Sequence, residues 1–128
     1  MARWEIKNVG MKGVAMAVPK NVVTTSELGL LSQEEAEVFD NTVGIKRRHI
    51  APDTMCASDM CQAAAEKLLT ELGWEKDSID VLLFESVTGD YRTPPTSCVL
   101  QDRLGLSENC FCMDIPCLLY TSPSPRDA

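Results

Sequence analysis

The sequence predicts an α/β domain, and three observations support this fold class. Two short apolar runs are typical of parallel strands that are buried on both faces: residues 81–84, and residues 110–115, which contain one carboxylate, Asp114, near the end. Residues 96–104 between them have the pattern of a helix, which Gly105 closes. A strand, a helix and a second strand in this order predict parallel pairing with a right-handed crossover.

Length and charge narrow the class of protein. The chain has 128 residues, enough for one domain, and its 45% hydrophobic and 24% charged residues are ordinary for a soluble protein. A net charge of -7 argues against nucleic acid or an anionic membrane as a partner. No apolar run approaches the roughly 20 residues of a membrane-spanning helix, and residues 1–7 lack the apolar core of a signal peptide. We therefore expect a cytoplasmic protein.

The first third of the chain is predicted to hold one strand and two helices. Residues 9–18 are apolar with interspersed glycines, which indicates a strand with a close backbone approach. Helices are expected near residues 26–31 and from residue 33 to about residue 42. Each follows a pair with capping-box spacing, Thr24 with Glu27 and Ser32 with Glu35.

The middle of the chain contains the clearest helix. It is predicted to start at a Ser58 cap and to end before Gly73. Its buried face is expected to be a stripe at helical spacing that consists of Cys61, Ala64, Ala65, Leu68 and Leu72. A polar turn or short helix at residues 75–80 then leads into the strand at 81–84.

Chemistry in such a sheet is expected just beyond the carboxyl ends of the strands, which here means after Asp114 and Ile115. Glu85 and Asp90 also follow a strand, but no partner for acid–base work is identifiable, so solvent exposure is the better interpretation. His49 is the only histidine, and we expect a structural role for it beside Arg48.

Six cysteines are many for this length, but none of them form a C-x-x-C pair. We interpret them as thiols in a reducing compartment and expect no metal site. They are Cys56, Cys61, Cys98, Cys110, Cys112 and Cys117.

Several local patterns coincide with those of one enzyme family. The segments are A-V-P-K-N-V-V-T at 17–24, G-I-K-R-R-H-I-A at 44–51 and S-I-D-V-L-L at 78–83. Pro95-Thr96 with Leu100-Gln101 and Leu104-Gly105 follows, and then Asp114-Ile115. In order and spacing, from about residue 9 to residue 116, the chain resembles the β-ketoacyl-acyl carrier protein synthase III family.

This resemblance implies a thiolase-like fold, of which residues 1–116 would form the first part of the N-terminal half. Members of the family condense an acyl-CoA starter with malonyl-acyl carrier protein in fatty acid or polyketide synthesis, and they are typically homodimers. A cysteine accepts the acyl group, and a histidine and an asparagine far downstream stabilise the developing charge. The resemblance implies acyl-CoA and acyl carrier protein thioesters as substrates and no separate cofactor.

The chain departs from the family pattern at the residues that carry the chemistry. The family cysteine lies five residues after the aspartate, and that position here is Leu119. Cys117 is two residues early, so we do not assign the catalytic role to it. The family often holds the CoA adenine with a tryptophan and an arginine, where this chain has Val38 and Thr42.

Three consecutive cations, Lys46, Arg47 and Arg48, form the only strongly basic patch. They are candidates for binding a CoA phosphate or an acidic carrier protein, although such a run is usually a solvated surface.

Residues 117–128 do not continue an α/β domain. Two Ser-Pro steps are incompatible with a helix, and the segment resembles a translated sequencing adapter. We expect a non-native or disordered tail and an inactive, poorly soluble fragment; a truncated paralogue is the alternative. Two other functions stay open: another thiolase-superfamily condensing enzyme, similar to hydroxymethylglutaryl-CoA synthase, and a non-catalytic acidic binding module.

Overall fold

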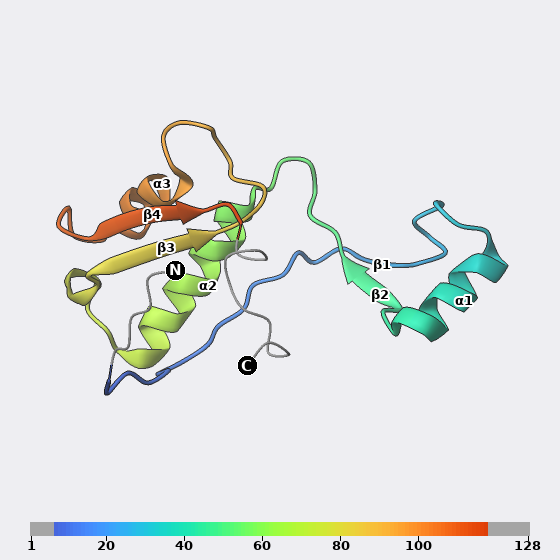
Figure 1. Cartoon of the computed structure of the whole chain (residues 1–128), viewed down its shortest axis with the longest axis horizontal. Coiled ribbons are helices and arrows are strands. Elements are labelled where there is room, and N and C mark those ends of the chain that lie inside the picture. The colour runs from blue at the N-terminus through green and yellow to red at the C-terminus, as the bar shows by residue number, and fades with distance from the viewer. Residues whose placement is uncertain (1–6, 118–128) are drawn as a thin grey trace.

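The structure of the chain is a computed structural model that describes residues 7–117. These residues form two parts joined by extended chain (Figure 1). One part consists of β1 (Val22–Thr24), α1 (Gln33–Val43) and β2 (Arg47–His49). The other consists of α2 (Ala57–Leu72), a 3-10 turn (Lys76–Ser78), β3 (Val81–Glu85), α3 (Thr96–Leu104) and β4 (Phe111–Ile115).

The predicted strand–helix–strand unit is confirmed. β3 and β4 pair in parallel, with Val81 opposite Phe111 and Glu85 opposite Ile115, and α3 connects them. Gly105 ends α3 in the left-handed conformation, with φ of 64°. Glycine adopts this conformation without the steric cost that a Cβ would impose, as the sequence pattern predicted.

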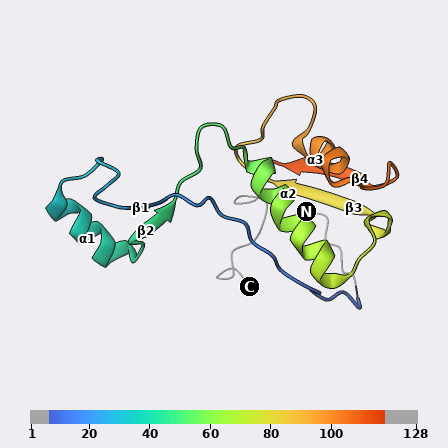
Figure 2. The same ribbon diagram turned by 180° about the vertical axis from the view of Figure 1, so that it is seen from behind.

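The apolar runs are typical of strands that are covered on both faces, but within residues 7–117 only one face of this sheet is covered. α2 and α3 contact each other and α3 contacts both strands, so the helices lie over one face of the sheet (Figures 1 and 2). Phe84 on that face is buried, whereas Leu83 and Met113 on the other face are exposed. Side chains alternate along a strand, so one open face leaves every second apolar residue in contact with solvent.

α2 has the predicted length, but its start and its stripe differ from the prediction. The helix begins at Ala57 with Cys56 as its N-cap, and Ser58 lies inside the first turn. The Cys56 N–H donates to Asp59 Oδ2 at 2.8 Å. Cys61 is exposed, while Leu68 and Leu72 are half-buried. The buried face of α2 is therefore narrower than predicted, because Cys61 does not belong to it.

Residues 9–18 run alongside α2 without forming a strand (Figure 2). No neighbouring strand among the described residues is available to pair with them, so the predicted strand is wrong. The predicted close approach is confirmed, because a Cβ built on Gly13 would lie 2.8 Å from Leu68 Cδ1. A side chain at this position would require the leucine side chains of α2 to move.

The two capping boxes have different outcomes. Ser32 and Glu35 cap α1, with the Ser32 N–H donating to Glu35 Oε2 at 2.9 Å. Thr24 and Glu27 make the equivalent bond at 2.7 Å, but only a turn follows, so the helix predicted at 26–31 is wrong. Gly29 adopts φ of 64° after a single turn and ends the structure before a helix can develop.

Residues that showed no strand pattern form a short antiparallel pair of strands, with α1 between them in the sequence. β1 pairs with β2, and Val23 lies opposite Arg48. Each strand has only three residues and β2 is basic, so no periodicity could have indicated this pairing.

No helix within residues 7–117 is long and apolar enough to cross a membrane.

Candidate functional site

The carboxyl end of β4 meets the N-terminus of α3 through one carboxylate. Asp114 Oδ2 accepts the Thr96 N–H at 2.7 Å, and Asp114 Oδ1 accepts the Ser97 N–H at 2.7 Å. The first N–H groups of a helix have no partner within the helix, and the helix dipole favours a negative charge beside them. This is the edge of the sheet at which the sequence predicted chemistry to begin.

The environment of Asp114 keeps its carboxylate charged. Burial acts to raise the pKa of Asp114, but the hydrogen bonds from Ser97 and Thr96 outweigh burial and lower the pKa below its ordinary value. Thr96 and Ser97 are the first two residues of α3 after the N-cap Pro95, so their N–H groups have no acceptor within the helix. At neutral pH the site therefore carries a fixed negative charge that is already hydrogen-bonded.

A second carboxylate joins this edge to α2. Asp90 accepts hydrogen bonds from the Ser58 hydroxyl and, at 3.4 Å, from the Ser58 N–H. The Asp90 N–H donates to Thr96 Oγ1 at 3.1 Å. Asp90 is therefore half-buried and bonded to two elements, and the expectation that it is merely solvent-exposed is wrong. Glu85, by contrast, is exposed as expected.

Arg103, near the C-terminal end of α3, completes the connection to α2. Its Nη1 donates to Ser58 Oγ at 2.9 Å and to Asp59 Oδ1 at 3.0 Å. Asp90, Ser58 and Arg103 were not identified from the sequence as members of a site. The partners are 32 and 45 residues apart, so no local pattern could have indicated the contact.

The structure places Cys117 near this edge, three residues after Asp114, with an exposed side chain. Leu119, the position of the nucleophile in the resemblance, lies outside the described residues. That neither Cys117 nor Leu119 acts as the catalytic nucleophile therefore stays a prediction.

The basic patch divides into one structural arginine and two exposed cations. Arg48 Nη1 donates to Thr25 Oγ1 at 3.0 Å, and the guanidinium lies 5.2 Å from the centre of the Phe39 ring. Thr25, which is buried, donates in turn to Asp40 of α1. Arg48 thus links β2 to α1 and is engaged in packing, whereas Lys46 and Arg47 are exposed to solvent.

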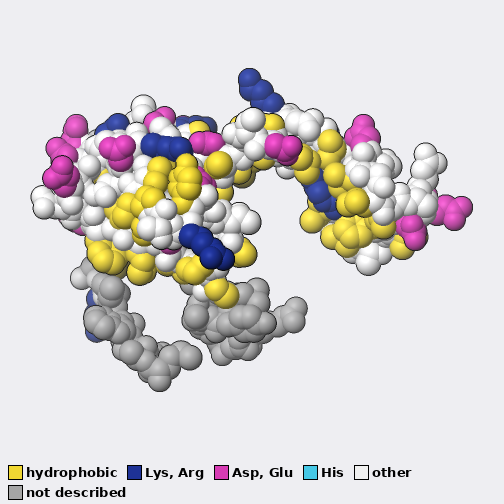
Figure 3. Space-filling view, turned by 90° about the horizontal axis from the view of Figure 1, so that it is seen from above, with side chains coloured by type: hydrophobic (Ala, Val, Ile, Leu, Met, Phe, Trp, Pro, Cys, Tyr) yellow, Lys and Arg dark blue, Asp and Glu magenta, His cyan; other side chains and the backbone are white. Residues whose placement is uncertain are grey.

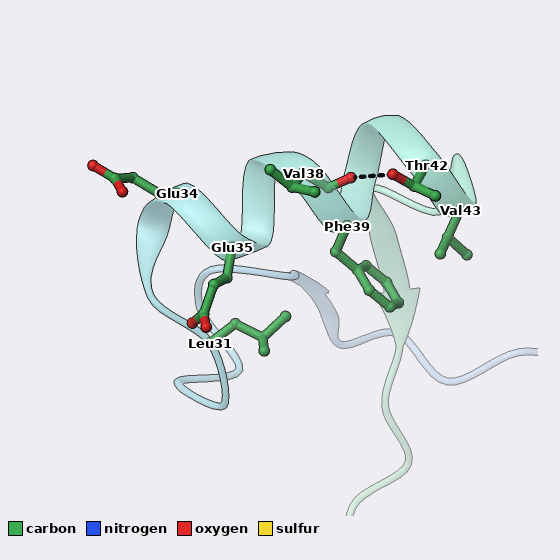
Figure 4. Close-up of a pocket in the computed structure, with 7 residues that line it drawn as sticks. All are labelled: Leu31, Glu34, Glu35, Val38, Phe39, Thr42 and Val43. Carbon is green, nitrogen blue, oxygen red and sulfur yellow. Dashed lines mark hydrogen bonds between the residues drawn. The ribbon is translucent and has the colours of Figure 1, made fainter.

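Val38 and Thr42 lie together in an apolar groove along α1, with Leu31, Phe39 and Val43 (Figure 4). Phe39 points from the helix toward the strands β1 and β2 (Figure 4). The Thr42 hydroxyl donates to the Val38 carbonyl at 2.8 Å. The charged residues that line the groove are Glu34 and Glu35.

Lys46 lies on another face of α1, beside Glu37 and Asp40. Apolar and basic side chains are neighbours on this part of the surface (Figure 3). The groove itself has no cation in its lining that could bind a phosphate.

His49 also has a structural contact, because its Nδ1 lies 2.6 Å from the Pro19 carbonyl oxygen. This agrees with the role expected for the single histidine.

The cysteines within residues 7–112 are thiols and form no disulfide. Burial and the neighbouring Cys110 raise the pKa of the Cys112 thiol to about 11. A thiol with such a pKa is protonated at neutral pH and is a poor nucleophile. In the described part of the chain, no group of three or more acidic, histidine or cysteine side chains could hold a metal ion.

Comparison with known proteins finds that the chain is similar to one group of enzymes. The chain is 37% identical over 103 residues to a β-ketoacyl-[acyl-carrier-protein] synthase III of Ehrlichia canis. The aligned region is 80% of this chain and 32% of that protein. The protein of the same name from Geobacillus kaustophilus is 37% identical over 106 residues, or 83% of this chain and 34% of that protein. No family model matches the chain.

Solved structures give the same result. A 3-oxoacyl-(acyl-carrier protein) synthase from Burkholderia xenovorans superposes with a TM-score of 0.73 at 36% identity, over 81% of this chain and 32% of that one. A 3-oxoacyl-[acyl-carrier-protein] synthase III from Aquifex aeolicus superposes with a TM-score of 0.70 at 28% identity, over 80% of this chain and 33% of that one. The chain therefore spans about a third of the length of the relatives it matches, and its fold is part of a thiolase-like fold.

Proposed function

We propose that this chain is a piece of a decarboxylating condensing enzyme, because it belongs to the β-ketoacyl-[acyl-carrier-protein] synthase III family. The observation that carries the proposal is that sequence and fold both match synthases of this kind, each over about four fifths of the chain.

The proposed reaction has two steps. A cysteine thiolate attacks the thioester carbonyl of an acyl-CoA; a carbon–sulfur bond to the enzyme forms, the bond to the CoA sulfur breaks, and CoA leaves as a thiolate that takes up a proton from water. Malonyl-acyl carrier protein then loses carbon dioxide, and the resulting carbanion attacks the carbonyl of the acyl-enzyme and breaks its bond to the enzyme sulfur. The products are a β-ketoacyl thioester on the carrier protein and the regenerated enzyme thiolate. Fixed hydrogen-bond donors stabilise the negative charge that develops on the thioester oxygens.

The 128-residue chain is proposed to be inactive in this reaction by itself. The position that the resemblance assigns to the nucleophile is Leu119, whose side chain cannot form a thioester. Cys117 is proposed not to replace it, because a two-residue shift at a strand end aims the thiol in another direction. Residues 117–128 are proposed to be a non-native tail on residues 1–116.

Two surface cations are the remaining candidates for substrate binding in this piece. Lys46 and Arg47 are exposed and could meet a CoA phosphate or an acidic carrier protein, whereas Arg48 is committed to Thr25 and Phe39. We further propose that the full-length protein is a cytoplasmic homodimer, as the resemblance implies. The names of the relatives favour a synthase III over an enzyme similar to hydroxymethylglutaryl-CoA synthase and over a non-catalytic acidic module.

Two experiments test the proposal. A long read of the source DNA across codon 116 is expected to continue with two codons, a cysteine codon and codons for small residues. A native gene that encodes the Ser-Pro-Ser-Pro tail would contradict the proposal for this product.

The second experiment is mass spectrometry of the chain after incubation with an acyl-CoA. No adduct is expected at Cys117, and the matched control is Cys117→Ser. Acylation that is lost in Cys117→Ser would overturn the assignment of the nucleophile.

A further inference from the structure

The loop between β3 and α3, residues 86–95, leaves the carboxyl end of β3 and returns to the start of α3 (Figure 1). Its apolar side chains do not hold it in place, because Val87 is 88% exposed and Tyr91 is 57% exposed. A segment with few buried apolar contacts opens easily unless hydrogen bonds restrain it. The position of this loop therefore depends on the hydrogen bonds that it makes with the rest of the fold.

Asp90 provides the hydrogen bonds that connect the middle of the loop to the helices. Its side chain accepts the Ser58 hydroxyl and, at 3.4 Å, the Ser58 N–H, and its own N–H donates to Thr96 Oγ1 at 3.1 Å. Among the described residues, no other part of the loop bonds to a helix except the capping turn of α3, and Ser86 and Thr88 bond to each other. Asp90 thus connects the loop to the first turns of both α2 and α3.

Both partners of Asp90 lie in the interior, because Ser58 and Thr96 are 0% exposed. Arg103 Nη1 donates to Ser58 Oγ at 2.9 Å. Arginine has no acceptor, so the Ser58 hydroxyl accepts at this contact and its single hydrogen is available for the carboxylate of Asp90. Water does not readily replace a bond that is lost at a buried group. The contact between Asp90 and Ser58 therefore restrains the loop in direction as well as in distance.

The loop and the end of β4 meet at Thr96. A Cβ built on Gly89 would lie 3.3 Å from Thr96 Oγ1, so the loop backbone passes close to the start of α3. The Thr96 N–H donates to Asp114 Oδ2 of β4 at 2.7 Å. Thr96 thus binds Asp90 through its hydroxyl and the strand end through its amide. This places the restrained loop at the edge of the sheet where ligands of parallel α/β sheets bind.

We propose that Asp90 is a positioning residue, which holds the loop 86–95 along the carboxyl edge of β3 and β4 through its contacts with Ser58 and Thr96. The inference rests on the proposed function only for the use of this edge as the site of the condensing reaction. Asp90 acts there through the loop and is not assigned a contact with substrate. The loop is expected to become mobile when the contact with Ser58 is lost, while both helices stay folded.

Limited digestion with trypsin tests the inference in the 128-residue chain without substrate. Arg92 lies in the loop and is exposed, and Lys67 lies in the middle of α2 with a side chain that is 60% exposed. Cleavage after Arg92 requires the loop to be mobile, whereas cleavage after Lys67 requires α2 to unfold. The ratio of the two initial rates, measured by mass spectrometry, therefore separates loop mobility from overall stability.

Ser58→Ala is the first variant to measure, because it removes the partner of Asp90 and leaves the sequence around Arg92 unchanged. The ratio of cleavage after Arg92 to cleavage after Lys67 is expected to rise by about tenfold or more, since a buried hydrogen bond to a charged group is lost. The matched control is Ser86→Ala, which removes a hydroxyl that bonds within the loop and not to a helix. Its ratio is expected to change by less than about twofold. An unchanged ratio in Ser58→Ala, or equal ratios in the two variants, would overturn the positioning role.

Combining Asp90→Ala with Ser58→Ala gives a second readout. The ratio for each chain is divided by the cleavage rate of a synthetic peptide with the same loop sequence, so that the effect of residue 90 on trypsin itself cancels. The double variant is expected to match Asp90→Ala, because the two residues act in one contact. Effects of the two substitutions that multiply would contradict the connection between Asp90 and Ser58.

If Ser58→Ala does not fold, which rapid cleavage after Lys67 would show, Asp90→Asn takes its place. The amide keeps the shape of the side chain and one of its two oxygens. The corrected ratio is expected to rise by about threefold or more, and an unchanged ratio would refute the inference. The digestion does not involve acyl transfer, so failure of the proposed enzyme activity leaves this test intact, and failure of this test leaves the family assignment intact.

Discussion

Arg48→Ala is expected to loosen α1 without disturbing the part of the molecule that carries β3 and β4. The substitution removes the 3.0 Å hydrogen bond to Thr25 Oγ1 and the stacking of the guanidinium over Phe39. Thr25 is 3% exposed and its hydroxyl also donates to Asp40. Because Thr25 is buried, water cannot easily replace the hydrogen bond that it loses from Arg48.

The magnitude follows from these two contacts. A hydrogen bond from a charged donor contributes about 1.5 kcal/mol at the low end of its range, which suits a half-buried arginine. The cation–π contact contributes about 0.5 kcal/mol at a partly exposed site. The sum, about 2 kcal/mol, corresponds to a change of about 30-fold in a local opening equilibrium.

Amide hydrogen exchange of α1 measures this opening, with α2 as the internal reference. Exchange of the α1 amides is expected to be about 30-fold faster in Arg48→Ala than in the wild type. The matched control is Arg47→Ala, which removes an exposed arginine from the same strand and is expected to change exchange by less than about threefold. Equal protection of α1 in the two variants would refute the assignment of Arg48 to packing.

Three further predictions concern the core, the charge and one glycine. Leu104 is 2% exposed, so Leu104→Ala is expected to lower the free energy of unfolding by about 2–5 kcal/mol. Leu83 is 52% exposed, so Leu83→Ala is expected to lower it by much less. Denaturant midpoints that rank the two variants in the reverse order would contradict the core assignment. The lowered pKa of Asp114 means that its contribution to stability is present above the unfolded-state pKa of about 3.9 and is lost as the pH falls through the lower folded-state pKa. The wild type should therefore lose more stability than Asp114→Asn in denaturant titrations between about pH 5 and pH 2, and parallel curves would count against this. Gly44→Ala is expected to destabilise α1 by about 1–2 kcal/mol through its φ of 78° alone, because nothing lies within 4 Å of the added Cβ; unchanged exchange in α1 would show that no strain arises.

The helices and the parallel pair were predictable because their signals are local. α1 follows a capping box formed by Ser32 and Glu35, and α3 ends at Gly105, so each boundary is written within a few residues. β3 was identifiable from a continuous apolar run. The capping pair Thr24 and Glu27 predicted a helix at residues 26–31 that does not form. The capping hydrogen bond is present, but Gly29 adopts a positive φ and ends the turn.

The open face of the sheet shows the limit of reasoning from apolar runs. An apolar run indicates that a strand belongs in an interior, but it does not say which segment covers each face. In residues 7–117 both helices lie on one side, so Leu83 and Phe111 remain exposed. Exposed apolar strands of this kind favour aggregation, and the low solubility expected for this chain stays a prediction.

The amino-acid sequence by itself determined the α/β class, the positions of α1, α2 and α3, and the resemblance that the comparisons then bore out. Only the tertiary structure decided what the polar side chains do. Asp114 binds a helix end 18 residues away, and Asp90 and Arg103 converge on Ser58 across 32 and 45 residues. The physical reason is that caps and periodicity act within one or two turns of chain, whereas a hydrogen bond across the fold requires that both elements first be packed in place.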